Sequence, residues 1–246
     1  MKIPKLPIVI VVCTITSICG VTLNAQLLET IRPFVDRVEH SLESLPAQRK
    51  EMLGGVVDYV MKKLSTDAEV QLIFICTHNS RRSHISQIWC HAAALHYGVE
   101  GVTTWSGGTE ATACNIRTVR ALRRAGVAVV ATTDSDNPMY LVQIAENDPP
   151  LRVFSKVYSE DGNPVADFAA MMCCSDVDSR CPVVFGADGR FALHYDDPKV
   201  ADDTPEEASR YDERNFQIAC EMFYVMSETS RRMRSGHPAT QTGGEK

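Results

Sequence analysis

The feature that most constrains the fold is an apolar stretch followed at once by a short polar run. The apolar stretch is residues 72–75, and the polar run, residues 76–83, contains a cysteine, two arginines and two serines. A short, nearly continuous apolar segment is typical of a strand buried within a parallel sheet. A tight loop that leaves such a strand and enters a helix directs backbone N–H groups and the positive helix end toward one point. The run therefore predicts a strand, an anion-binding loop and a helix, in that order.

Within this run, Cys76 is the candidate nucleophile. Only a thiolate attacks, and the pKa of a free thiol, about 8.5, falls beside N–H groups and a helix N-terminus. Arg82 offers a planar fork that matches two oxyanion oxygens, and Ser83 can donate a hydrogen bond to the thiolate. Asn79 suits a loop organiser because asparagine tolerates left-handed backbone geometry. The other residues of the candidate oxyanion loop are Thr77, His78, Ser80 and Arg81. On spacing alone, a buried strand-end cysteine before a solvated turn remains the alternative.

Two further segments of the sequence make the functional interpretation of the first segment more specific. Residues 174–182 place Cys174 and Cys181 seven positions apart, and residues 195–198 contain Asp197 before a proline. In this order, the three segments resemble the low-molecular-weight protein tyrosine phosphatase superfamily, and within it the thioredoxin-coupled arsenate reductases. The resemblance covers residues 72–227. The paired cysteines favour the reductase branch, because hydrolysis of a phosphocysteine needs no second thiol.

The resemblance implies a role for each of these residues. Cys76 would form a covalent arsenate adduct, Cys174 would attack it and release arsenite, and Cys181 would then attack Cys174. Thioredoxin or another dithiol would reduce the final disulfide, and no bound cofactor is expected. Asp197 would be the general acid that protonates a leaving oxygen, with Asp196 as the neighbouring alternative.

The chain departs from the family pattern at three positions. His78 stands where glycine is usual, and Arg81 stands where cysteine is frequent; we expect Arg81 to point to solvent. Gln87 replaces a glutamate of a potassium site found in some members, so we expect no bound ion. No histidine and cysteine spacing indicates a zinc site.

Geometry constrains the last step of the implied relay. If the segment were helical, Cys174 and Cys181 would be separated by about 10.5 Å along the axis. A disulfide requires Cα atoms closer than about 7 Å. We therefore expect this segment to be a loop or to unwind on oxidation. Because adjacent strand residues point to opposite faces, only one of Cys173 and Cys174 can face the loop.

Two other functions remain open. The first is a low-molecular-weight tyrosine phosphatase acting on phosphate monoesters. Trp105 could supply a wall for a phenyl ring, although the residues after Pro198 lack the aromatic side chains usual in that branch. The second is a non-catalytic oxyanion-binding or redox-sensing protein. A net charge of −6 provides no basic field for nucleic acid, and we expect a monomer.

The N-terminus has the pattern of a secretory signal. Lys2 and Lys5 precede an apolar stretch over residues 6–21, and a small residue, Ala25, offers a cleavage position. We expect export to the periplasm or cell envelope and no other membrane contact. An uncleaved anchor and a cytoplasmic protein translated from a later start such as Met52 are the alternatives. Removal of residues 1–25 would leave seven of the nine cysteines at irregular spacings, which does not indicate a disulfide scaffold.

The pattern along the rest of the chain predicts an α/β fold. Residues 26–69 form a helical extension, which either packs on the core or acts as a spacer. Residues 70–230 form the phosphatase-like domain, with strands over 70–75, 102–105, 127–132 and 165–173 alternating with helices. This alternation predicts a three-layer architecture, a parallel four-stranded sheet with helices on both faces. Residues 134–150 indicate an inserted hairpin, and residues 231–246 a disordered tail. Ligands of such sheets bind beyond the carboxyl ends of the strands, where the three motifs would meet.

Overall fold

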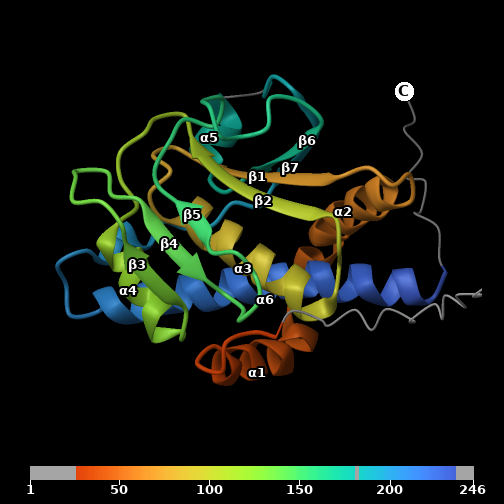
Figure 1. The fold of residues 1–246 in the computed structure, drawn as a ribbon, viewed down its shortest axis with the longest axis horizontal. Helices are drawn as coiled ribbons and strands as arrows, with labels where there is room; N and C mark the ends of the chain where they lie inside the picture. The colour runs from red at the N-terminus through yellow and green to blue at the C-terminus, as the bar shows by residue number, and fades with distance from the viewer. Residues whose placement is uncertain (1–25, 181–182, 237–246) are drawn as a thin grey trace, which may run out of the picture.

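The computed structural model describes residues 26–180 and 183–236. Its centre is a four-stranded sheet with the order β2-β1-β6-β7, in which all three neighbouring pairs are parallel (Figure 1). The strands are β1 (Val70–Cys76), β2 (Val102–Gly108), β6 (Phe168–Met172) and β7 (Ala187–Ala192). The predicted four-stranded parallel sheet is therefore confirmed.

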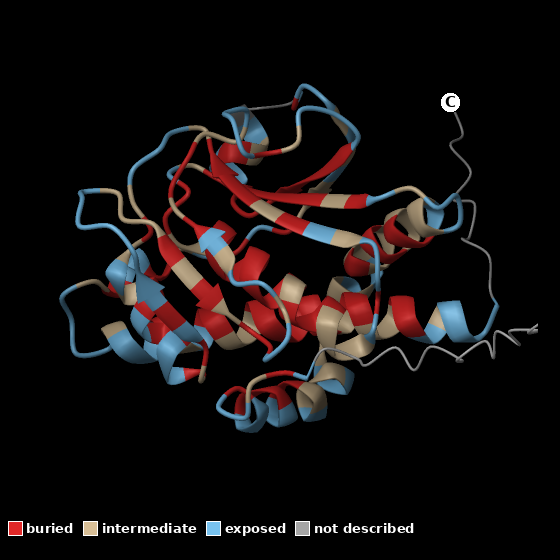
Figure 2. Ribbon diagram, in the orientation of Figure 1, coloured by how far each residue is buried: buried red, intermediate tan, exposed pale blue. Residues whose placement is uncertain are grey.

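The two central strands are buried on both faces, as their continuous apolar sequences predict. Every residue of β6 is buried, and Gln71 alone in β1 is partly exposed. In Figure 2 the buried residues follow these strands and the helix faces that cover them. Such burial fixes the sheet, and with it the position of the residues that follow each strand.

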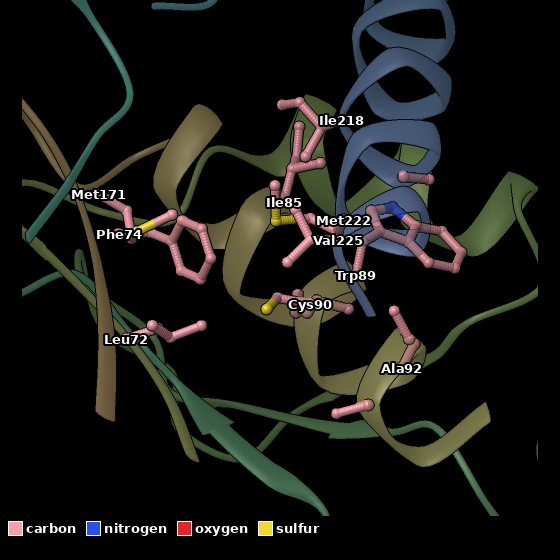
Figure 3. Packing of buried hydrophobic residues seen from close by; sticks show 14 of the residues in the cluster. Leu72, Phe74, Ile85, Trp89, Cys90, Ala92, Met171, Ile218, Met222 and Val225 are labelled. Carbon is pink, nitrogen blue, oxygen red and sulfur yellow. The ribbon is translucent and has the colours of Figure 1, made fainter. Parts of the chain in front are cut away.

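Helices cover the two faces of the sheet unequally. The helices α2 (Ala47–Leu64), α3 (Arg82–Tyr97) and α6 (Glu207–Arg234) lie on one side, where α6 packs on both α2 and α3. The opposite side carries the short helix α5 (Ser175–Arg180), which contacts β1 and β6. Figure 3 shows Phe74 and Leu72 of β1 facing Ile85 and Cys90 of α3.

The fourth strand of the sheet differs from the prediction. Residues 127–132 do form a strand, β3 (Ala128–Ala131), but it pairs antiparallel with β4 (Tyr140–Gln143) in a separate sheet of order β3-β4-β5. The strand β5 (Leu151–Val153) completes this sheet. The segment 134–150 therefore does not form a hairpin by itself: it contains one strand, β4, which pairs with strands on either side of the segment. The parallel position is taken by β7, an edge strand with no fully buried residue. No apolar run marks such a strand in the sequence.

The N-terminal extension is part of the core. It contains α1 (Arg32–Ser41), the short 3-10 helix η1 (Leu42–Ser44) and α2. Ile31 and Val38 are fully buried, and the Phe34 ring stacks on Trp89 of α3 with centroids 4.6 Å apart. Residues 26–69 therefore pack on the domain and are not a spacer.

The C-terminal helix extends further than expected. The helix α6 ends at Arg234, inside the segment predicted to be a disordered tail from residue 231. The proposed export segment, residues 1–25, lies outside the described residues. Within the part of the chain that the structure describes, no helix is long and apolar enough to cross a membrane.

Candidate active site

The polar run after β1 forms a loop that ends at the first turn of α3. Asn79, in the middle of the loop, has a left-handed backbone with a φ of 44°. Its side-chain amide donates to Ser83 Oγ at 2.9 Å, and its Oδ1 accepts from the backbone N–H of Lys156 at 2.9 Å. One side chain therefore joins the helix end of the loop to a neighbouring segment, as predicted for a loop organiser.

The loop is rich in backbone donors that have no protein acceptor. Within residues 26–180 and 183–236, the N–H groups of residues 77–81 form no hydrogen bond to a protein acceptor. Asn79 and Ser80 are buried, and buried N–H groups are almost always paired in folded proteins. The arrangement next to the α3 N-terminus suits an oxyanion that accepts these bonds.

Cys76 lies beneath this loop at the end of β1 and is buried. Its Sγ lies 3.1 Å from Ser83 Oγ. Because Ser83 Oγ already accepts a hydrogen bond from Asn79, its own proton is available to a Cys76 thiolate. Asn79, Ser83 and Cys76 thus form a chain of hydrogen bonds that ends at the sulfur.

Two loop side chains face away from this point. The His78 ring is half-exposed, with its Nε2 3.7 Å from Glu110. Ser80 Oγ donates to the carbonyl oxygen of Ala113 at 2.7 Å. These side chains contact residues outside the loop. Any contribution of His78 and Ser80 to anion binding therefore comes from their backbone N–H groups.

The acid loop meets the oxyanion loop through Arg82. Its Nη2 pairs with Asp197 Oδ2 at 2.9 Å, and its Nη1 donates to the carbonyl oxygen of Tyr195 at 2.9 Å. Asp197 Oδ1 also caps the 3-10 helix η2 (Pro198–Ala201) by accepting from Lys199 N. Of the two candidate acids, Asp197 lies at the site, whereas the Asp196 side chain is 96% exposed and pairs with Arg214.

The expectation that Arg81 points to solvent is wrong. Its side chain is mostly buried, and its Nε donates to the Tyr211 hydroxyl at 2.9 Å. Its guanidinium also lies within 3.7 Å of Asp202 and 3.9 Å of Asp197. The turn η2 and the start of α6 supply these partners, and neither is close to Arg81 in the sequence. Two arginines therefore flank Asp197.

The two adjacent cysteines after β6 differ in their contacts, as strand alternation predicts. Cys174 Sγ lies 3.7 Å from Thr77 Oγ1 of the oxyanion loop. Cys173 Sγ lies 3.8 Å from Ser86 Oγ of α3. Burial, followed by the nearby Cys76 sulfur, raises the pKa of the Cys173 thiol well above its usual range. Cys174 is therefore the one that contacts the loop.

The segment between the predicted relay cysteines is helical. Cys174 immediately precedes α5, and Cys181, which lies outside the described residues, follows it. Asp178 of α5 pairs with Arg190 at 2.5 Å and with His194 at 2.8 Å. A disulfide between Cys174 and Cys181 therefore requires unwinding of α5 and loss of these contacts.

Sequence analysis missed a buried network beneath the acid loop. Arg49 of α2 forms two hydrogen bonds with Glu221 of α6, at 2.7 and 2.6 Å. Glu221 Oε2 also accepts from the Tyr195 hydroxyl at 2.8 Å, and the Arg49 guanidinium lies over the Tyr195 ring at 5.3 Å. The network connects the N-terminal extension to the residue that binds Arg82. No local pattern marks it, because its members are far apart in the sequence.

Comparisons with known proteins agree with this geometry. No protein-family model matches the chain. The chain is similar to an arsenate reductase from Bacillus licheniformis, at 29% identity over 136 residues, which make up 55% of this chain and 79% of that protein. The predicted resemblance to the arsenate reductases is borne out by this relative at the level of sequence, and the parallel sheet agrees with the fold that the resemblance implies.

Solved structures similar to this chain include phosphatases of two kinds. A low-molecular-weight protein tyrosine phosphatase from T. tengcongensis has 14% sequence identity and a TM-score of 0.43, over 65% of this chain and 99% of that one. The YwlE arginine phosphatase from Geobacillus stearothermophilus has 14% identity and a TM-score of 0.44, over 68% of this chain and 97% of that one. Among the described residues, no group of three or more His, Cys, Asp or Glu side chains could hold a metal ion.

Proposed function

We propose that this protein reduces arsenate to arsenite through a covalent cysteine adduct and a three-cysteine relay. The observation that carries the proposal is the position of Cys174, whose thiol touches Thr77 of the loop above Cys76. A phosphatase needs the loop, the arginine and the acid, but it has no use for a second thiol at this place. The arsenate reductase relative is consistent with this choice.

The first step uses the residues of the oxyanion loop. Arsenate accepts hydrogen bonds from the unpaired N–H groups of residues 77–81 and displaces Asp197 from Arg82. The Cys76 thiolate attacks arsenic and forms a sulfur–arsenic bond, while one arsenate oxygen leaves as water. Asp197, released from the arginine, acts as the general acid and supplies a proton to that oxygen.

The second and third steps move the electrons. The Cys174 thiolate attacks the Cys76 sulfur, the sulfur–arsenic bond breaks, and its electron pair reduces As(V) to As(III), which leaves as arsenite. The Cys181 thiolate then attacks Cys174, so that a Cys174–Cys181 disulfide forms and the Cys76 thiolate is regenerated. A dithiol of the thioredoxin class returns two electrons and two protons to this pair.

The proposal is tested by arsenate-dependent oxidation of NADPH in the presence of thioredoxin and thioredoxin reductase. Turnover should be lost in Cys76→Ser, Cys174→Ser and Cys181→Ser. Cys173→Ala is the matched control, because this buried thiol neighbours Cys174 but contacts Ser86, and it should retain turnover. Absence of arsenate-dependent turnover, with hydrolysis of p-nitrophenyl phosphate that survives Cys174→Ser, would reject the reductase.

The second candidate function is hydrolysis of phosphate monoesters through a phosphocysteine. The contact between Arg82 and Asp197 supports it as much as it supports the reductase, because a phosphatase also needs an arginine and an acid beside the loop. Trp105 gives it no support as a wall for a phenyl ring, because it lines a separate cavity that does not include Cys76. A non-catalytic redox sensor would show reversible thiol oxidation with neither activity.

We further propose that the chain is exported by its N-terminal segment and that its dithiol partner is therefore a thioredoxin-like protein of the cell envelope. Lys2, Lys5 and the apolar stretch that follows support the proposal. Cell fractionation tests it. A product shortened by about 25 residues in the periplasm or envelope is expected, and an unprocessed cytoplasmic product would reject it.

A further inference from the structure

A cavity separate from the Cys76 loop lies beside the edge strand β2. It has a volume of about 710 Å³ and is lined by residues of β2, α3 and the segment that contains β5. Cavities that hold small molecules measure roughly 300–1,000 Å³. Cys76 and the rest of the oxyanion loop are not among its lining residues, so it is not part of the candidate active site.

Most of the cavity wall is apolar. Trp105 of β2 contributes to it, and the segment around β5 contributes two adjacent prolines, a leucine and a phenylalanine: Pro149, Pro150, Leu151 and Phe154. Walls of this kind bind the aromatic or aliphatic body of a ligand by excluding water from it.

One charged side chain in the wall forms no ion pair among the described residues, although the negative charge of Glu160 acts on it. Lys156 is 5% exposed, and within the described residues its ammonium group forms no ion pair and no hydrogen bond. Its Nζ lies over the ring of Phe154, 4.7 Å from the ring centroid. Burial lowers the pKa of Lys156 to about 8, so the side chain is still mostly charged at neutral pH.

The position of Lys156 is held firmly by its backbone. Its N–H donates to Asn79 Oδ1, and its carbonyl oxygen accepts from Gly108 N, both at 2.9 Å. A buried charge without a partner is costly, yet the backbone keeps this lysine at the cavity wall. A cation fixed in advance at such a wall loses little freedom when it binds an anion.

The same wall contains buried polar atoms without hydrogen-bond partners. They are Gln87 Oε1, Thr104 Oγ1 and Trp105 Nε1, and all three residues line the cavity. Two acidic residues also line the cavity: Asp148, which pairs with His91 at 2.7 Å, and Asp161, which is exposed. Lys156 thus brings a buried positive charge to the cavity wall, and the same wall carries donors and acceptors that form no hydrogen bond within the described residues.

We propose that this cavity is a binding site for a small organic anion, a carboxylate or sulfonate attached to an aromatic or aliphatic body. The anionic group binds the Lys156 ammonium, and the body lies against Trp105 and Leu151. The proposal does not depend on the reaction at Cys76.

The probe is anilinonaphthalene sulfonate, titrated by fluorescence into the full-length, natively folded chain. Saturable binding of one probe per chain is expected. Lys156→Met should weaken it about tenfold or more, as expected for loss of one charge-assisted contact, whereas Lys156→Arg should retain it. The neutral analogue phenylnaphthylamine should not respond to Lys156→Met. Inorganic phosphate, which would occupy the Cys76 loop, should not displace the probe.

A second variant keeps the test decisive if Lys156→Met alters folding. Leu151→Trp fills the cavity without removing the charge and should abolish probe binding. Val130→Trp places the same ring at an exposed position of β3, in the same small sheet, and should leave binding unchanged. Equal affinity in wild type, Lys156→Met and Leu151→Trp, or displacement by phosphate, would overturn the proposal.

Discussion

The buried pair between Arg49 and Glu221 makes the N-terminal extension a structural part of the active site. The Glu221 side chain is 1% exposed and the Arg49 side chain 19% exposed, and the pair is joined by two short hydrogen bonds. In Arg49→Met, Glu221 would keep the Tyr195 hydroxyl at 2.8 Å and the Gln217 amide at 3.3 Å, but no cation. Loss of one partner of a buried pair costs about 3–5 kcal/mol. Because Arg49 is partly solvated, we expect a loss of about 3 kcal/mol in the free energy of unfolding.

Urea denaturation of four proteins measures this effect: the wild type, Arg49→Met, Glu221→Gln and the double variant. If the cost of Arg49→Met comes from an uncompensated carboxylate, the second substitution removes that charge. The double variant should then lose at least about 1 kcal/mol less than the sum of the single variants. A loss below about 1 kcal/mol in Arg49→Met, or simple additivity, would refute the reasoning.

Three further predictions concern ionisable side chains. Burial, with the nearby Lys156 charge, lowers the pKa of His84 to about 3 from 6.5. The unfolded chain therefore binds the proton first as the pH falls. The free energy of unfolding should decrease by about 3 kcal/mol between pH 7 and 4.5. Urea denaturation measures this loss, which should be absent in His84→Gln. Lys156→Met should stabilise the protein at pH 7, by up to about 3 kcal/mol, because the folded-state pKa is lowered from 10.5 to about 8. That advantage should fade as the pH rises from 8 to 10.5, and no gain at pH 7 would contradict it. Asp178→Ala should speed formation of the Cys174–Cys181 disulfide, because α5 loses its contacts with Arg190 and His194. Thiol trapping measures the rate of disulfide formation. An unchanged rate would show that unwinding of α5 does not limit it.

The parts of the fold that are local in the sequence were predictable. The apolar runs of β1 and β6 predicted central parallel strands, and the run from Cys76 to Ser83 predicted a loop followed by a helix. In the structure Asn79 has the left-handed backbone expected of a loop organiser, and Ser83 contacts the cysteine sulfur. Each of these features depends on residues within one element and its next turn.

The parts that depend on distant residues were not predictable in the same way. The edge strand β7 lacks buried residues, so its sequence carries no strand signal, and β3 was assigned to the wrong sheet. The environment of Arg81 is set by Tyr211, which is 130 positions away. The contact of Arg49 with Glu221 spans 172 positions. Such contacts form only after the helices have packed.

The central claim is that the Cys174 thiolate attacks the Cys76 sulfur of the arsenate adduct, and that this attack reduces arsenate to arsenite. A single-turnover experiment tests it most directly: the fully reduced protein is mixed with arsenate without any external dithiol, and arsenite and free thiols are counted. We predict one arsenite released per chain, the loss of two thiols, and a Cys174–Cys181 disulfide found by peptide mass spectrometry. In Cys181→Ser the disulfide should instead join Cys76 and Cys174. Arsenate binding with no arsenite released and no thiol lost would contradict the claim.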